Sequence, residues 1–158
     1  MEKELELFEN WPYRVPNIEK VVEKIHSFTV KLQRAKTPEE ALKIWKSAAR
    51  YEDSYSNEIT HIQVLFTLDS LNPRYVKDNE TLDEGLPLIQ SASTEFAKAV
   101  LESPYRSYLE TKLGTHQFTI YDYRLRSFDE RIVDDCIEEN KLVTEYDMTI
   151  AKIKIEFR

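Results

Sequence analysis

Glycine is nearly absent from this chain, since only Gly85 and Gly114 occur among its 158 residues. Tight turns, β-hairpins and phosphate-binding loops need backbone conformations with positive φ, which glycine adopts at little cost. The sequence therefore argues against a fold rich in such turns and against a glycine-rich nucleotide loop. We expect long helices joined by short connections.

Cysteine occurs once, so the chain has neither an internal disulfide nor a cysteine-based zinc site. Cys136 has four close acidic neighbours, Asp134, Asp135, Glu138 and Glu139, and such surroundings do not activate a thiol. We interpret Cys136 as a packed structural residue rather than a nucleophile. The four acids are interpreted as a solvated patch, because paired carboxylates do acid–base work only when burial or crowding separates their pKa values.

Positive charge and long apolar runs are also scarce. The chain has 29 acidic and 22 basic residues and a formal net charge of -7, whereas nucleic-acid binding needs a cationic face. Uncharged runs such as residues 59–68 are about half the length that a membrane span needs, and the first residues lack the features of a signal peptide. We expect a cytoplasmic protein that binds neither nucleic acid nor membrane.

What the chain does have is apolar residues at helical spacing, with capping residues where the helices should begin. Asn17, Thr37 and Asn72 are good N-caps, the last two stand before a proline, and Glu40 can complete a capping box with Thr37. The pattern predicts long helices over about 17–35, 37–71, 72–102 and 127–157, and short helices over 103–114 and from 115. Gly85-Leu86-Pro87 predicts a kink in the third helix.

Two long helices carry further expectations. Leu65 and Leu68 widen the apolar face of the second helix, which suggests burial on two sides there. Ser127 and Glu130 form a second capping box, from which the last helix would run to Phe157 with one apolar face. That face comprises Ile132, Val133, Cys136, Val143, Tyr146, Ile150, Ile153 and Phe157.

These elements predict an all-α fold, an antiparallel bundle of long helices with two short helices and no sheet. Residues 1–16 would form an extended N-terminal arm, and residues 17–158 a single helical domain. The last helix is still strongly patterned where the sequence stops at Arg158. We therefore expect a fragment of a larger protein.

Two pairs of residues are candidates for a metal site. Glu23 with His26, and Glu58 with His61, form E-x-x-H pairs of the kind that begin a di-iron site in a helical bundle, and no histidine lies in an H-E-x-x-H zinc motif. Glu23 and His61 point well away from the apolar stripes of their helices, so solvent-exposed residues are the better interpretation. We predict no catalytic, cofactor-binding or metal-binding residue.

Tyrosine is frequent, with nine residues in the chain. The set includes Tyr51, Tyr55, Tyr105, Tyr108, Tyr121 and Tyr123. Such side chains could line a peptide groove, because tyrosine combines a flat apolar ring with a hydroxyl. Packing at helix edges is the simpler interpretation of any single one.

Several segments, taken in order, carry a resemblance. They are Trp11-Pro12-Tyr13-Arg14-Val15-Pro16-Asn17, Ser103-Pro104-Tyr105-Arg106, Lys112-Leu113-Gly114, Glu139-Asn140-Lys141-Leu142 with Tyr146, and Ile150 to Phe157. Together they resemble the N-terminal region of the oligoendopeptidase F family, the zinc metallopeptidases related to thimet oligopeptidase. The resemblance covers nearly the whole chain but only the first part of a family member.

The resemblance implies an all-helical region that forms one wall of the channel in which short peptides are cut. In the family, two histidines and a glutamate hold zinc, and the glutamate of H-E-x-x-H is the general base; none of those positions exists here. We therefore expect the N-terminal helical region of such a peptidase, inactive alone, with a catalytic half, a second copy or short peptides as partners. The alternatives are a stand-alone helical protein-interaction module and a di-iron bundle enzyme.

Overall fold

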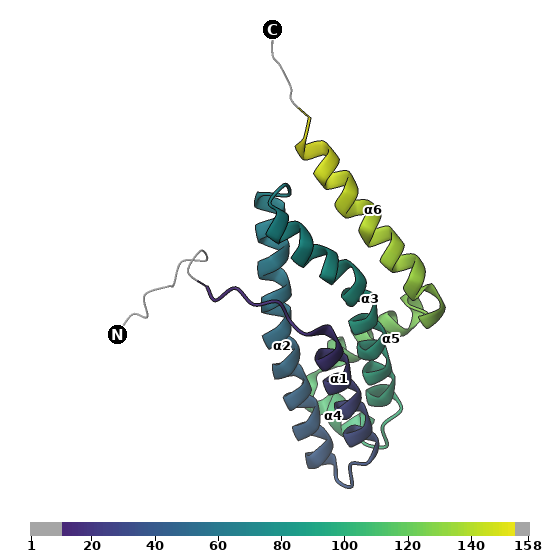
Figure 1. The fold of residues 1–158 in the computed structure, drawn as a ribbon. Helices are drawn as coiled ribbons and strands as arrows, with labels where there is room; N and C mark the ends of the chain where they lie inside the picture. The colour runs from purple at the N-terminus through teal and green to yellow at the C-terminus, as the bar shows by residue number, and fades with distance from the viewer. Residues whose placement is uncertain (1–10, 154–158) are drawn as a thin grey trace.

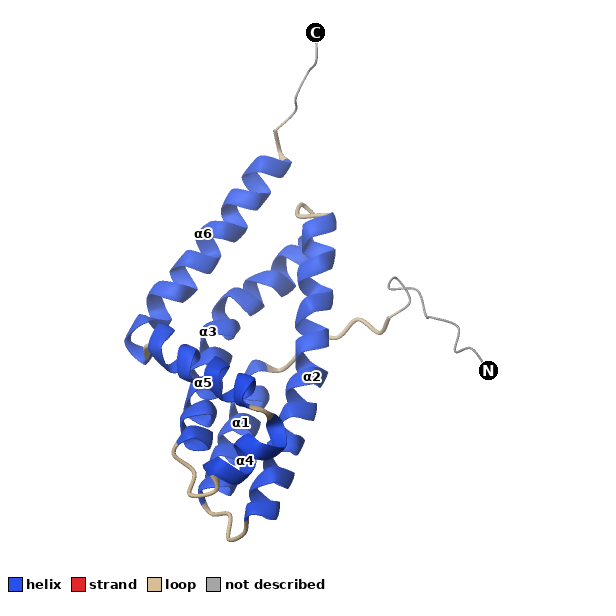
Figure 2. Ribbon diagram, turned by 180° about the vertical axis from the view of Figure 1, so that it is seen from behind, coloured by secondary structure: helices blue, strands red, loops and turns tan. Residues whose placement is uncertain are grey.

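The computed structural model describes residues 11–153. Within them it contains six α-helices and one 3-10 turn and no strand, so the predicted all-α bundle is confirmed (Figures 1 and 2). The elements are α1 (Ile18–Gln33), α2 (Pro38–Leu68), α3 (Pro73–Leu101), α4 (Arg106–Leu113), α5 (Thr115–Ser127), η2 (Glu130–Ile132) and α6 (Val133–Ala151). No helix in this part of the chain is long and apolar enough to cross a membrane.

The three predicted N-caps are confirmed, because each capping side chain accepts a backbone N–H from the first turn of its helix. These bonds run from Lys20 to Asn17 Oδ1 (2.9 Å), from Glu40 to Thr37 Oγ1 (3.1 Å) and from Arg74 to Asn72 Oδ1 (3.1 Å). The Glu40 carboxylate also accepts the Lys36 N–H at 2.8 Å, just before the cap. Gly114 ends α4 with φ of 89°, a conformation that favours glycine.

The core lies where α3 packs against α1, α2 and α5. Its largest fully buried side chains are Leu32, Ile62, Leu82, Val100 and Leu109. A polar contact joins two of the walls, since Trp45 Nε1 on α2 donates to the Tyr121 hydroxyl on α5 at 2.8 Å. Apolar faces from five helices therefore meet in one core, as the helical periodicity of the sequence requires.

The expected kink is present as a bend within a continuous helix. Figure 1 shows that α3 changes direction partway along its length, and Pro87 lies inside it. Proline lacks the N–H of the helical ladder and its ring clashes with the carbonyl four residues earlier, which bends helices. Gly85 is buried beside the first residue of α1, Ile18, and lets α1 lie directly on the α3 backbone.

The expected start and end of the last helix are wrong. Ser127 is the last residue of α5, and no Ser127–Glu130 capping box forms. The chain then passes through buried Phe128 in an extended conformation and enters the turn η2, where the Asp129 carboxylate accepts the Arg131 N–H at 2.9 Å. The α6 helix begins only at Val133 and ends at Ala151. Phe157 lies outside the described residues.

The wider buried apolar face that Leu65 and Leu68 suggested for the end of α2 does not form, because Leu68 is 74% exposed and Val64 is exposed as well. The cause is the difference in length between two neighbouring helices. The α1 helix has 16 residues and α2 has 31, so the C-terminal part of α2 extends beyond α1 (Figure 1). The buried apolar residues of this part, Ile62 and Phe66, share one face, and the other buried residue there is His61.

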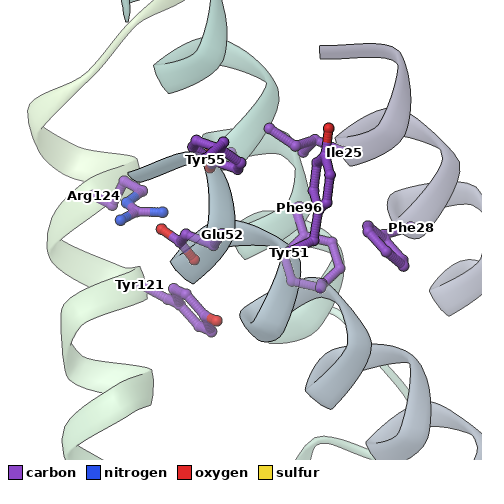
Figure 3. Close-up of a pocket in the computed structure, with 10 residues that line it drawn as sticks. Ile25, Phe28, Tyr51, Glu52, Tyr55, Phe96, Tyr121 and Arg124 are labelled. Carbon is purple, nitrogen blue, oxygen red and sulfur yellow. The ribbon is translucent and has the colours of Figure 1, made fainter. Parts of the chain in front are cut away.

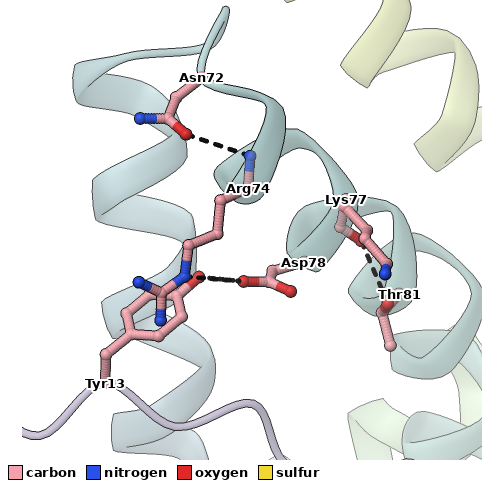
Figure 4. A network of polar contacts seen from close by, with 6 residues as sticks. All are labelled: Tyr13, Asn72, Arg74, Lys77, Asp78 and Thr81. Atoms are coloured by element: carbon pink, nitrogen blue, oxygen red, sulfur yellow. Dashed lines mark hydrogen bonds and ion pairs between the residues drawn. The ribbon is translucent and has the colours of Figure 1, made fainter.

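Residues 11–17 are neither helix nor strand, and Tyr13 fastens them to α3. The Tyr13 hydroxyl donates to Asp78 Oδ2 at 2.5 Å, and the Arg74 guanidinium lies 4.2 Å from the Tyr13 ring centroid (Figure 4). Burial, and then the hydrogen bond to Asp78, raise the pKa of the Tyr13 phenol well above its ordinary value. The division into an arm over residues 1–16 and a domain over 17–158 stays a prediction.

Candidate interaction surface

Helix α6 differs from the other long helices in what it buries. Its only buried residue is the polar Thr144. The helix packs against α3 and η2 (Figures 1 and 2). A helix that belongs to a bundle core normally turns an apolar stripe inward. The inner face of α6 therefore differs from that of a core helix, because its one buried side chain is polar.

Polar side chains hold α6 on α3. The Thr144 hydroxyl donates to Asp83 Oδ2 at 2.7 Å and accepts from Asn79 Nδ2 at 2.9 Å. The Asn140 amide donates to the backbone carbonyl of Asp83 at 3.1 Å. We call these four residues, Asn79, Asp83, Asn140 and Thr144, the clasp. Every buried side-chain nitrogen and oxygen in the described part of the chain has a partner, so the clasp is a satisfied polar network.

Two ionisable groups at the clasp have shifted pKa values. Burial raises the pKa of the Asp83 carboxyl, and the hydrogen bond from Thr144 opposes that shift in part. At the exposed rim, Lys141 Nζ lies 2.7 Å from Glu84 Oε1, and this contact raises the pKa of Lys141. The α3–α6 contact thus contains a buried acid, Asp83 of the clasp, and an exposed ion pair beside the clasp.

The opposite face of α6 is apolar and open to solvent. We call it the outer stripe, formed by Leu142, Tyr146, Ile150 and, just beyond the helix, Ile153. Their exposed fractions run from 48% to 65%. At about 100° per residue, Leu142, Tyr146 and Ile150 lie about 160°, 200° and 240° around the helix from Thr144. Of the apolar face predicted from the sequence, Tyr146, Ile150 and Ile153 lie on this stripe and are exposed. Leu142 was not predicted, Cys136 is half-buried and Ile132 lies in η2.

Open hollows flank α6 where it lies on α3. One, of about 250 Å³, lies between α2, α3 and α6 and includes Phe66, Leu86 and Val143 in its lining. The other, of about 500 Å³, is bordered by acidic side chains of α3 that include Glu80 and Glu84. Close-packed interiors leave few voids of this size. The α3–α6 contact is therefore loosely packed: it joins the polar clasp to half-buried apolar side chains on the same side of α6, namely Val133, Ile137 and Met148.

The tyrosines do not gather into a peptide groove. Tyr51, Tyr55 and Tyr121 share a cavity of about 20 Å³ with Glu52 and Arg124 (Figure 3). A cavity of that size has room for about one water molecule. Burial raises the pKa of all three phenols. Of the others, Tyr105 and Tyr108 are half-buried and Tyr123 is exposed.

The two E-x-x-H pairs have separate surroundings. His26 is exposed and its Nδ1 lies 3.1 Å from Glu95 Oε2 on α3. His61 is only 6% exposed, because the rings of Trp11 and Tyr13 lie against it at centroid distances of 6.3 and 5.6 Å. The expectation of a solvent-exposed His61 is therefore wrong. The pattern of α2 alone does not show that a preceding segment covers this residue.

The acidic neighbours of Cys136 are all exposed, as expected, and the cysteine itself is half-buried. Within residues 11–153, no group of three or more His, Cys, Asp or Glu side chains could hold a metal ion. The described donor groups therefore do not fit a zinc or di-iron site. The candidate functional site of this structure is therefore an interaction surface, the outer stripe of α6.

Comparison with known proteins defines the family. Residues 8–128 match the family model of the Peptidase M3 N-terminal domain. The chain belongs to this family. The match ends at residue 128, before α6 begins at Val133. A search of curated proteins found no match.

Solved structures of peptidases have the fold of this M3 N-terminal domain. A putative oligoendopeptidase F from Bacillus anthracis str. Ames is similar over 95% of this chain and 28% of its own, with a TM-score of 0.89 and 27% identity. PZ peptidase A with an inhibitor gives a TM-score of 0.91 and 28% identity over 96% and 27% of the two chains. A further putative oligoendopeptidase F gives 0.90 and 26% over 96% and 27%. The chain thus spans just over a quarter of these proteins, and the family resemblance read from the sequence is confirmed.

Proposed function

We propose that this M3 N-terminal domain is the helical, channel-wall region of an oligoendopeptidase F-like zinc peptidase that hydrolyses short peptides. The observation that carries the proposal is the family match over residues 8–128, joined to the likeness with peptidases more than three times as long. In such an enzyme this region forms one wall of the peptide channel, and the remaining part of the protein carries out the hydrolysis. A cytoplasmic location is part of the proposal, and the single cysteine supports it.

Zinc would be held by that remaining part. The chain has no H-E-x-x-H motif, and its described residues offer no set of metal ligands. When bound, zinc would supply Lewis-acid activation of water for peptide hydrolysis. No step of that reaction is assigned to a residue of this chain.

The outer stripe supports association with a second body. Contiguous exposed apolar surface on a protein marks a site that another surface covers. Leu142, Tyr146 and Ile150 form such a surface on the last described helix. A catalytic half packed against α6 would remove these side chains from water.

The test is the size and activity of the native polypeptide. An antibody raised against this chain should detect, in source cells, a band several times heavier than 18.7 kDa. The immunoprecipitated protein should hydrolyse a quenched-fluorescence peptide and lose that activity with a zinc chelator, while the purified 158-residue chain should hydrolyse nothing. A band at 18.7 kDa with no peptidase activity in the precipitate would overturn the proposal.

A stand-alone interaction module is the second candidate, and the exposed outer stripe is the observation that favours it. Under this alternative the band lies at 18.7 kDa, and the precipitate contains a non-peptidase protein whose binding is lost when Tyr146 is replaced by serine. The same immunoprecipitation therefore separates the two functions.

A further inference from the structure

Two boundaries coincide between α5 and α6. The family match ends at residue 128. Phe128 is also the last buried apolar side chain in the described part of the chain, since beyond it only Thr144 is buried. The hydrophobic core of the domain is therefore complete before α6 begins.

The distribution of polar and apolar side chains on α6 indicates that its apolar face packs against something other than the helical bundle. Thr144 and Asn140 face α3 and make hydrogen bonds, whereas Leu142, Tyr146 and Ile150 face away and are exposed. An amphipathic helix lies with its apolar stripe toward the core to which it belongs. The apolar residues on the α3 side, Val133, Ile137 and Met148, are only half-buried. The exposed apolar side of α6 therefore points to a second core on the side opposite α3.

The similar peptidases show how much polypeptide is available to form that second core. Each is similar to 95% or 96% of this chain, but the match covers only 27% or 28% of its own length. More than two thirds of each similar protein therefore lies outside the matched region. The partner of the outer stripe is then another part of the same polypeptide in a longer protein of this kind.

We infer that α6 is structurally the first helix of the half that follows the M3 N-terminal domain, with its outer stripe packed into that half and the clasp as the contact between the two halves. This inference rests on the proposed function, because it needs the longer polypeptide. The α3–α6 contact is then an interface between domains, which are commonly more polar than domain cores. Asn79 and Asp83 contact the following half through Asn140 and Thr144.

The first test is hydrogen exchange on the 158-residue chain. If α6 is no part of the bundle, its amides should exchange at least about a hundredfold faster than the core amides of α1 and α3, because separate units open with separate free energies. Thr144→Val should speed exchange in α6 at least about tenfold and leave α1 and α5 unchanged. At concentrations where the chain is monomeric, the matched control Tyr146→Ser, on the outer stripe, should leave the exchange of all helices unchanged.

Protection of α6 equal to that of α3 would overturn the inference, as would a Thr144→Val variant in which all helices lose protection together. Either result would make α6 a core helix of this domain. Thr144→Val keeps the shape of the side chain and Tyr146→Ser changes an exposed position, so both variants should fold.

The second test compares the same substitution in two settings. Tyr146→Ser should leave the Tm of the 158-residue chain, extrapolated to low concentration, unchanged and lower the Tm of the heavier native polypeptide by several degrees, because Tyr146 is buried there and exposed in the monomeric chain. No change in either setting would overturn the inference while the proposed function stood. Absence of the heavier polypeptide on the immunoblot would overturn both, so the two failures are distinguishable.

Discussion

Ile18 occupies the space that a side chain at Gly85 would need. A Cβ on Gly85 would lie 2.5 Å from Ile18 Cγ1 and 2.6 Å from its Cδ1, well inside the contact distance of two carbon atoms. The first residue of α1 thus lies directly on the α3 backbone, near the proline that bends α3. One of the two glycines in this chain is explained by close approach, and the other, Gly114, by its positive φ.

Gly85→Ala should destabilise the protein despite the better helix propensity of alanine. The propensity gain is about 1 kcal/mol, and overpacking in a filled core costs about 1–3 kcal/mol, so we expect a net loss measured by urea unfolding. The double variant Ile18→Ala with Gly85→Ala should lose less than the sum of the two single variants, because the clash is gone. Gln90→Ala, at an exposed position of α3, is the control.

Additive losses in that double variant would contradict the packing argument. A gain in stability from Gly85→Ala alone would show that Ile18 moves aside without cost. The coupling free energy between the two positions is therefore the informative quantity.

The starts of α1, α2 and α3 were predictable from the sequence because their causes are local. The caps at Asn17, Thr37 and Asn72 each depend on a backbone N–H within three residues. The burial of His61 was not predictable in this way, because it depends on Trp11 and Tyr13, which lie far earlier in the chain. Local chemistry is visible in sequence, whereas coverage by a distant segment is not.

The candidate surface on α6 was also predictable only in part. The periodicity of the sequence placed Tyr146 and Ile150 on one side of α6, since residues three and four apart share one side of a helix, but it missed Leu142. It did not reveal that Thr144 and Asn140, on the other side, would meet α3. An amphipathic pattern predicts which face of a helix is apolar. It does not predict whether the surface that covers this face lies in the same domain. The Ser127–Glu130 box misled because Phe128, between them, is buried and extended.

Tyr13→Phe should weaken the attachment of the N-terminal segment to α3. The variant removes the hydrogen bond to Asp78 and leaves that carboxylate with Arg74, whose Nε is 3.9 Å away. A hydrogen bond to a charged group contributes about 1.5–3 kcal/mol, and partial exposure of this site places the expected loss at the low end. Urea unfolding measures the loss, and hydrogen exchange should show faster exchange near His61.

Tyr123→Phe is the matched control, because Tyr123 is exposed on α5 and should tolerate the change. Equal stability of the Tyr13 and Tyr123 variants would show that the Tyr13 hydroxyl contributes nothing to the fold. Loss of exchange protection throughout the bundle would instead show that the segment is part of the global unfolding unit.

Asp83 should make the stability of the protein depend on pH in an unusual direction for a carboxylate. Burial raises its folded-state pKa above the ordinary value of 3.8, so the folded protein holds the proton more tightly than the unfolded chain does. The contribution of Asp83 is then most favourable below pH 3.8 and is lost as pH rises through the raised folded pKa. Other acids titrate in the same range, so the comparison must be with a variant.

Asp83→Asn removes this ionisation while its amide can still hydrogen-bond to Thr144. The free energy of unfolding of the wild type minus that of the variant should fall as pH rises from 3 to 7, a range of about four units around the ordinary pKa of a carboxyl. Urea unfolding at several pH values measures that difference. A difference that rises with pH would mean that the Thr144 hydrogen bond, and not burial, dominates the pKa of Asp83.

The 158-residue chain should self-associate through the outer stripe of α6, since its apolar side chains are exposed in this structure. Full burial of a leucine or isoleucine side chain contributes about 1.5–3 kcal/mol, so replacing Leu142, Tyr146 and Ile150 with serine should weaken association more than about tenfold. Sedimentation velocity over a range of concentrations measures this. The Tm extrapolated to low concentration should not fall, because none of the three is buried in the domain.

The matched control is the pair Ile120→Ser and Tyr123→Ser, which removes exposed apolar side chains of α5 instead. This pair should leave the association constant unchanged, because isolated exposed apolar residues are common on monomeric proteins. A wild-type chain that stays monomeric at every concentration would show that the outer stripe does not pair with itself. Equal weakening by the control pair would place the contact on α5 and remove α6 as the interaction surface.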